Sequence, residues 1–142
     1  MIKYISLLLT GSILFFTSCK KSVSQSVLEK YFSDNVIGQN CSVTLAIDST
    51  GDITSEYTGY VFVLLKTDYY HGPLKATKGT NTYMGTWSSN EDYSKLVITL
   101  PDSVPKFQFL SRSWRFTKKG NPTMELAPWG TNQPYVLHMT KQ

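Results

Sequence analysis

Residues 76–88 read ATKGTNTYMGTWS and have the pattern of a β-hairpin. The turn-forming residues Gly79-Thr80-Asn81 separate a short strand from a second run, in which Tyr83, Gly85 and Trp87 share a face. A period of two is the side-chain repeat of a strand, so Trp87 is expected on the buried face. The stretch therefore predicts two antiparallel strands joined by a tight turn.

The same period continues on both sides of this hairpin. Val43, Leu45 and Ile47 alternate with polar residues, so all three are expected on the buried face of one strand. Further strands are expected at residues 59–65, 96–100, 114–119, 124–126 and 135–139. The whole set, about seven or eight strands, predicts an all-β fold: an antiparallel meander that closes into a barrel or folds into a half-open sandwich.

A short helix is expected before the first strand. Ser26-Val27-Leu28-Glu29 matches a capping box, in which the Ser and Glu side chains bind free backbone N–H groups. Val27, Leu28, Tyr31 and Phe32 then fall on one helical face. We expect the helix over 26–32, as the start of a single β-domain spanning 26–142.

The N-terminal segment has the pattern of an export signal. Lys3 gives a positive start, an apolar stretch runs from Ile5 to Phe16, and the small residues Thr17-Ser18 precede Cys19. Phe16-Thr17-Ser18-Cys19 resembles the bacterial lipobox, with Phe16 in place of the usual Leu. We interpret residues 1–18 as a lipoprotein signal peptide, Cys19 as the lipidated residue and 19–25 as a polar tether.

Two other interpretations of this segment stay open. One is an ordinary secretory signal followed by an incidental cysteine. The other is a membrane-spanning anchor, but a spanning helix needs about 20 apolar residues and this stretch is shorter. Attachment through lipid on Cys19 is the interpretation that we favour, and several acyl chains would make it stable.

Composition and cysteine content narrow the function. The net charge of +4 is a mild bias and does not indicate a nucleic-acid partner. With Cys19 lipidated, Cys41 has no disulfide partner, and we expect it to be a small, half-buried apolar residue. The sequence has no G-x-S-x-G or phosphate-loop motif, and Asp48, Asp52 and Glu56 lack EF-hand spacing. We therefore expect no catalytic residue, metal or cofactor.

Several motifs match one group of proteins. They are Gly59-Tyr60-Val61-Phe62, the Gly85-Thr86-Trp87-Ser88 strand, Trp114 after Phe109-Leu110-Ser111, and the closing run 135–139. Over roughly residues 59–141 the chain resembles the lipocalin-like domains of Bacteroidota lipoproteins. The resemblance implies a small antiparallel barrel on a lipid anchor, with no catalytic residues to transfer.

The resemblance also bears on location. Surface-exported lipoproteins of this group usually have acidic residues after the cysteine, whereas this chain has Lys20-Lys21-Ser22. That difference favours the periplasmic face of the outer membrane and leaves the cell surface open. The two lysines can lie against anionic lipid headgroups.

One loop departs from the family pattern and supplies the candidate binding residues. Where the family has an Asp-Gly turn, this chain has an aromatic loop containing Tyr69, Tyr70 and His71. With Trp129 in a later loop, these rings can stack on a flat or carbohydrate-like ligand. The alternative is that they pack at the ends of the barrel.

The sequence also contains a basic run and two tryptophans at strand positions. The densest basic run consists of Arg112, Arg115, Lys118 and Lys119. We interpret it as a solvated outer face, with contact to an acidic partner or to lipid headgroups as the alternative. Trp87 and Trp114 occupy inward strand positions and are expected to fill the interior.

Two function classes lead, and an enzyme, which would need a polar cleft beside His71 or His138, is the third alternative. The first is a non-enzymatic, lipid-anchored barrel that binds a small apolar ligand or a protein partner. The second is a structural or inhibitory envelope module with a filled core. An apolar interior cavity above about 300 Å³ would favour the first.

Overall fold

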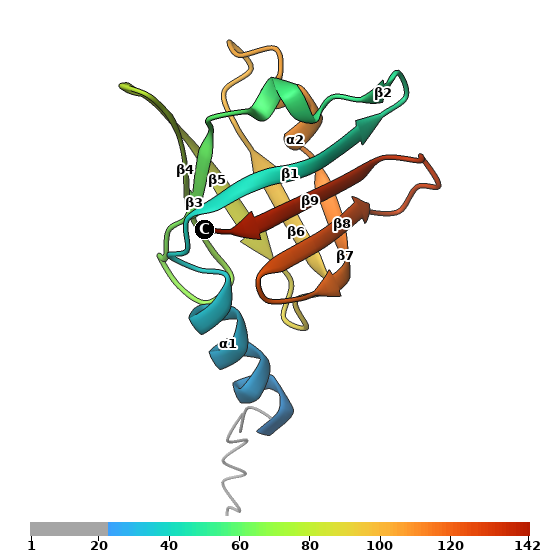
Figure 1. Cartoon of the computed structure of the whole chain (residues 1–142). Helices are drawn as coiled ribbons and strands as arrows, with labels where there is room; N and C mark the ends of the chain where they lie inside the picture. The colour runs from blue at the N-terminus through green and yellow to red at the C-terminus, as the bar shows by residue number, and fades with distance from the viewer. Residues whose placement is uncertain (1–22) are drawn as a thin grey trace, which may run out of the picture.

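The computed structural model describes residues 23–142, which form a β-barrel with one longer helix at its N-terminal end (Figure 1). The elements are α1 (Val23–Asn35), β1 (Cys41–Asp48), β2 (Gly51–Asp52), η1 (Thr54–Tyr57), β3 (Val61–Leu64), β4 (His71–Lys78), β5 (Asn81–Ser89), β6 (Lys95–Thr99), α2 (Phe107–Leu110), β7 (Ser113–Lys119), β8 (Thr123–Pro128) and β9 (Val136–Lys141).

The strands form one closed antiparallel barrel. From β3 to β9 each strand pairs with the next along the chain, and β1 pairs with both β9 and β3. The barrel is therefore made of eight strands, and β2 extends the sheet beside β1 as an additional short strand. This confirms the predicted antiparallel meander and selects the barrel over the half-open sandwich.

The hairpin at residues 76–88 forms as expected. Lys78 pairs with Asn81 across a turn in which Gly79 has a φ of +58°. A positive φ at this position matches the right-handed twist of the two strands. Farther along β5, a Cβ on Gly85 would lie 2.1 Å from the carbonyl oxygen of Thr99, so only glycine permits this approach to the β6 end.

The expected pattern of β1 is wrong in its second half. Val43 is buried as predicted, but Leu45 and Ile47 are only half-buried, and Ala46 is completely buried instead. The pairing of β1 with β9 shifts register between Val43 and Leu45. A bulge of this kind adds one residue to a strand and so reverses which face the following side chains occupy.

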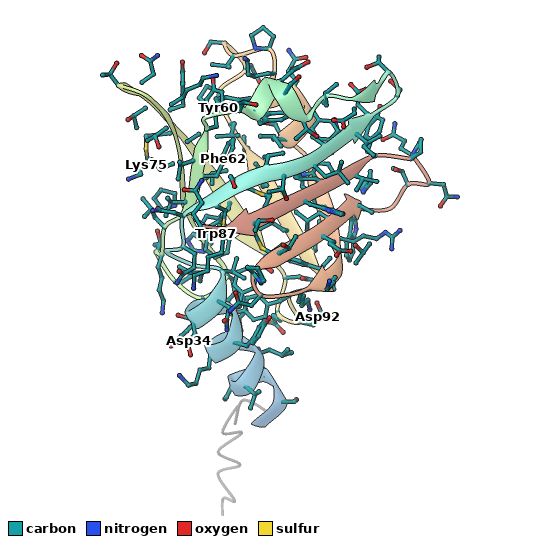
Figure 2. The ribbon with its side chains drawn as sticks, in the orientation of Figure 1. Asp34, Tyr60, Phe62, Lys75, Trp87 and Asp92 are labelled. Carbon is teal, nitrogen blue, oxygen red and sulfur yellow. The ribbon has the colours of Figure 1, made fainter. Side chains whose placement is uncertain are left out.

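Large side chains fill the barrel interior. Trp87 and Trp114 are 1% and 0% exposed, which confirms their inward positions. Each indole N–H also has a partner, because Trp87 Nε1 donates to Leu65 O at 2.7 Å and Trp114 Nε1 donates to Leu110 O at 2.9 Å. Tyr60, Phe62 and Trp87 follow one another along the barrel in Figure 2.

Helix α1 covers one end of the barrel. Phe32 is 1% exposed, and its ring centroid lies 4.4 Å from that of Tyr93, 5.8 Å from that of Trp87 and 6.0 Å from that of Phe116. Val36 and Ile37 continue into the same core, and Ile37 forms a parallel bridge to Leu64. The helix is therefore fastened to the barrel by side chains and by backbone pairing.

The details of this helix differ from the sequence prediction. It begins at Val23, within the predicted tether, and it ends at Asn35. Ser26 is thus an interior helical residue rather than a cap. Glu29 is 6% exposed and accepts a hydrogen bond from the Tyr70 hydroxyl, and Val27, predicted on the packed face, is 62% exposed.

The opposite end of the barrel is closed by η1 and α2, drawn at the top of Figure 1. Phe107 of α2 is 0% exposed, and its ring meets those of Tyr60 and Tyr83 edge-on at 5.4 and 5.3 Å. The Tyr57 hydroxyl of η1 donates to Lys106 O at 2.7 Å and joins the two segments.

Replacing Phe32 with alanine tests how α1 is held. Loss of this buried ring leaves a cavity between the helix and the barrel, and we expect the free energy of unfolding to fall by about 3–5 kcal/mol. Val27→Ala on the exposed face of the same helix is the control and should change it by less than about 0.5 kcal/mol. Urea denaturation gives both values. Equal effects would contradict the packing of α1.

Candidate functional site

The surface cavities lie at the ends of the barrel. Two of them, of about 400 and 230 Å³, lie along α1, and the larger is lined by Tyr69 together with polar residues of the helix. A third, of about 270 Å³, lies between η1 and α2 at the other end. The inward-facing side chains between these ends form one continuous core cluster. The space between the two ends is therefore occupied by side chains.

We call the cavity between η1 and α2 the α2 cleft. Its acidic lining residues, Asp48 and Glu56, come from the end of β1 and from η1. Its basic lining residues, Lys106 and Arg112, flank α2 in the chain. The remaining lining residues are Ile53, Pro105, Gln108, Phe109 and Tyr135. Opposite charges thus enter the cleft from two different segments, beside an aromatic and aliphatic surface.

Arg112 is held in position by both polar and aromatic contacts. Its Nε donates to Phe109 O at 2.7 Å. Its guanidinium carbon lies 4.7 Å from the ring centroid of Tyr135, 5.1 Å from that of Phe109 and 5.4 Å from that of Trp114. Cation–π contact and a backbone acceptor fix the direction of this side chain.

The side chains of Lys106 and Asp48 also have hydrogen-bond partners. Lys106 Nζ donates to Glu56 O at 3.4 Å. Asp48 accepts hydrogen bonds from Thr50 N at 2.7 Å and Thr50 Oγ1 at 2.6 Å. These bonds lower the pKa of Asp48, chiefly through the Thr50 hydroxyl, so that its carboxylate is charged at neutral pH.

No salt bridge joins the two sets of charges. Within residues 23–142, neither Lys106 nor Arg112 pairs with Asp48 or Glu56; the salt bridges lie elsewhere, such as Lys118 with Glu125. The Tyr57 hydroxyl lies among these groups, and burial followed by the nearby Glu56 raises its pKa. The cleft therefore holds complementary charges that are close but not in contact.

The predicted aromatic loop lies at the α1 end. Tyr70 is occupied in the fold: its hydroxyl donates to Glu29 and accepts from Gln25 Nε2 at 2.9 Å, and its ring stacks on Tyr93 at 5.6 Å. Tyr69 is 39% exposed, with Lys66 Nζ 3.9 Å from its ring centroid. The loop therefore serves the docking of α1 through Tyr70 and presents Tyr69 to solvent.

His71 and Trp129 have separate surroundings. His71 is exposed, and its Nδ1 lies 2.9 Å from Asp68 Oδ2. Trp129 is 39% exposed in the loop between β8 and β9, where its backbone N–H donates to Ser113 O at 2.9 Å and its ring lies 5.3 Å from Lys95 Nζ. Tyr69, Tyr70 and His71 thus share one loop, and the contacts of Trp129 are with other strands.

The basic run does not form one cluster. Arg112 enters the α2 cleft, Arg115 is exposed on β7, and Lys118 pairs with Glu125 at 3.1 Å. Lys119 Nζ donates to Asp92 O at 3.2 Å. The register shift in β7 between Phe116 and Lys118 contributes to this separation. The sequence pattern singled out Arg112 as part of a basic run. It could not predict the cleft that Arg112 lines, because Asp48 and Glu56 are distant in the chain.

The structure describes only one of the two cysteines. Cys19 lies outside the described residues. Cys41 is free and 2% exposed, more buried than predicted, and burial raises its pKa to about 11. Residues 23–142 contain no group of three or more potential metal ligands. In the same part of the chain, no helix is long and apolar enough to cross a membrane.

Comparison of the chain with models of known families, with curated proteins and with solved structures found no match.

The thiol of Cys41 should be unreactive in the folded protein. A rise in pKa from 9.0 to about 11 lowers the thiolate fraction at pH 8 by about a hundredfold, and burial blocks access as well. In a Cys19→Ala background, alkylation by iodoacetamide at pH 8 should therefore be at least about a hundredfold slower than in denaturant. The rate should rise as the pH approaches 11. Similar rates in the two states would contradict this assignment.

Proposed function

We propose that this protein is a lipid-anchored envelope module that recognises its partner with its outer surface rather than enclosing an apolar ligand. The observation that carries the proposal is the filled barrel. Trp87, Trp114 and Phe62 occupy its interior, while Phe32 and Phe107 close its two ends. A barrel of eight strands has room for its own side chains or for one small ligand, and here side chains take that room.

The anchor supplies the second part of the proposal. The pattern before Cys19 is that of a lipoprotein signal, and α1 begins at Val23, shortly after that cysteine. The lipid would therefore be attached close to the barrel end that α1 covers. The η1 and α2 end, which lies opposite α1 in Figure 1, would then face away from the membrane.

The family resemblance supports the same conclusion. A lipocalin-like lipoprotein of Bacteroidota combines a lipid anchor with a small antiparallel barrel, and the closed barrel of this chain is consistent with that plan. The proposed location is the periplasmic face of the outer membrane, on the basis of Lys20-Lys21 after the anchor. The proposal includes no catalytic role.

Lipid labelling tests the anchor. Bacteria expressing the full chain are grown with an alkyne-bearing fatty acid, and the protein is then isolated and conjugated to a fluorophore. We expect labelling of the wild type and of Cys41→Ala, since Cys41 is buried, and no labelling of Cys19→Ala. Equal labelling of the wild type and Cys19→Ala would contradict the anchor.

An apolar probe tests the filled barrel. The Cys19→Ala chain is titrated with N-phenyl-1-naphthylamine, whose fluorescence increases in an apolar pocket. Because aromatic side chains occupy the interior, we expect no saturable increase while the protein is folded. Saturable binding of one probe per chain, lost on unfolding, would show an interior site and restore the ligand-carrier function.

A further inference from the structure

The α2 cleft separates two kinds of charge by their place in the fold. Asp48 and Glu56 come from the β1–η1 segment, and Lys106 and Arg112 come from the segment around α2. Two negative and two positive side chains thus line one cavity of about 270 Å³. The cleft is close to electrically neutral as a whole but polar across its width.

These charges are held apart rather than joined. Arg112 is fixed by Phe109 O and by three aromatic rings, and Asp48 is fixed by Thr50. Neither cation of the cleft forms a salt bridge with Asp48 or Glu56 in residues 23–142. Charged groups that are positioned in advance lose little conformational entropy when a ligand binds. A ligand that carries both charges can therefore pair with both sides at once.

The lining of the cleft is mostly polar, with a smaller apolar part beside the Arg112 guanidinium. Phe109 and Tyr135 have ring centroids 5.9 Å apart, and Ile53 packs beside them against the core. Such a surface accepts an aliphatic or aromatic side chain of a ligand. The volume lies just below the common range for ligand pockets, about 300–1,000 Å³, and therefore selects a small molecule.

We infer that the α2 cleft binds a small zwitterion with an apolar side chain, its ammonium facing Asp48 and Glu56 and its carboxylate facing Arg112 and Lys106. An α-amino acid and a dipeptide share this chemistry. Arg112 suits a carboxylate because its planar guanidinium has donors beyond the Nε that bonds Phe109 O and the Nη2 that lies 3.5 Å from Gln108 O. This inference deepens the proposed function. It rests on that function for one point, which is that the cleft faces away from the membrane.

The test is an NMR titration of the full wild-type chain in detergent micelles. The probes are L-phenylalanine and L-alanyl-L-phenylalanine, with N-acetyl-L-phenylalanine lacking the ammonium and L-phenylalaninamide lacking the carboxylate. We expect saturable shifts of backbone amides in residues 105–112 with the amino acid or the dipeptide. Each one-charge analogue should bind about tenfold more weakly or worse.

Three variants and a matched control separate binding from folding. Lys106→Gln and Asp48→Asn each remove one charge from the cleft and should weaken binding of the better zwitterion about tenfold, with the thermal midpoint maintained. Arg115→Gln removes an exposed charge outside the cleft and should leave binding unchanged. Arg112→Lys keeps the charge but loses the planar fork, and binding should fall while remaining measurable.

The outcomes are distinct. If neither zwitterion shifts the cleft amides, or if the one-charge analogues bind equally well, the inference is wrong. If binding is as strong in Lys106→Gln and Asp48→Asn as in Arg115→Gln, it is wrong as well. Binding that persists in Cys19→Ala would support the cleft even if lipid labelling had refuted the anchor, so the two proposals fail separately.

Discussion

The small interior of an eight-stranded barrel is the constraint on which this structure depends. Pairing of β1 with β9 and β3 closes the sheet and removes its open edges. Closure leaves an inner space that the two tryptophans and their aliphatic neighbours fill, and both indole N–H groups reach backbone carbonyls. Within residues 23–142, no buried side-chain nitrogen or oxygen atom lacks a hydrogen-bond partner, so the large rings are packed without that cost.

With the interior filled, the surface cavities of residues 23–142 described above lie at the ends of the barrel. At one end α1 is packed on the barrel through Phe32, and the buried Glu29 binds the Tyr70 hydroxyl beneath the helix. The aromatic loop that was expected to bind a ligand is thereby partly used for internal packing. At the other end, η1 and α2 close the barrel but leave a charged cleft between them. The two ends therefore differ in structure: helix α1 packs on one, and the other has the α2 cleft.

Local patterns predicted most of the fold. The turn at Gly79 and the alternation up to Trp87 each depend on neighbouring residues, and the hairpin formed as expected. The bulge in β1 was missed because its position depends on the partner strand β9, which lies far along the chain. The capping box at Ser26 was misleading because the helix begins at Val23, and Glu29 accepts a hydrogen bond from Tyr70 of a distant loop.

Some features could be predicted from the sequence and others could not, because the residues that determine them are neighbours in the chain in the first case and distant in the second. Strand periodicity, turn residues and the pattern before Cys19 are local properties, so the order of residues was sufficient for the all-β meander and for the lipid-anchor hypothesis. Closure of the barrel, the filling of its interior and the α2 cleft require residues from distant segments to meet. Asp48 and Arg112 lie at the same cleft only because β1 and the α2 segment reach the same barrel end, a placement decided by three-dimensional packing.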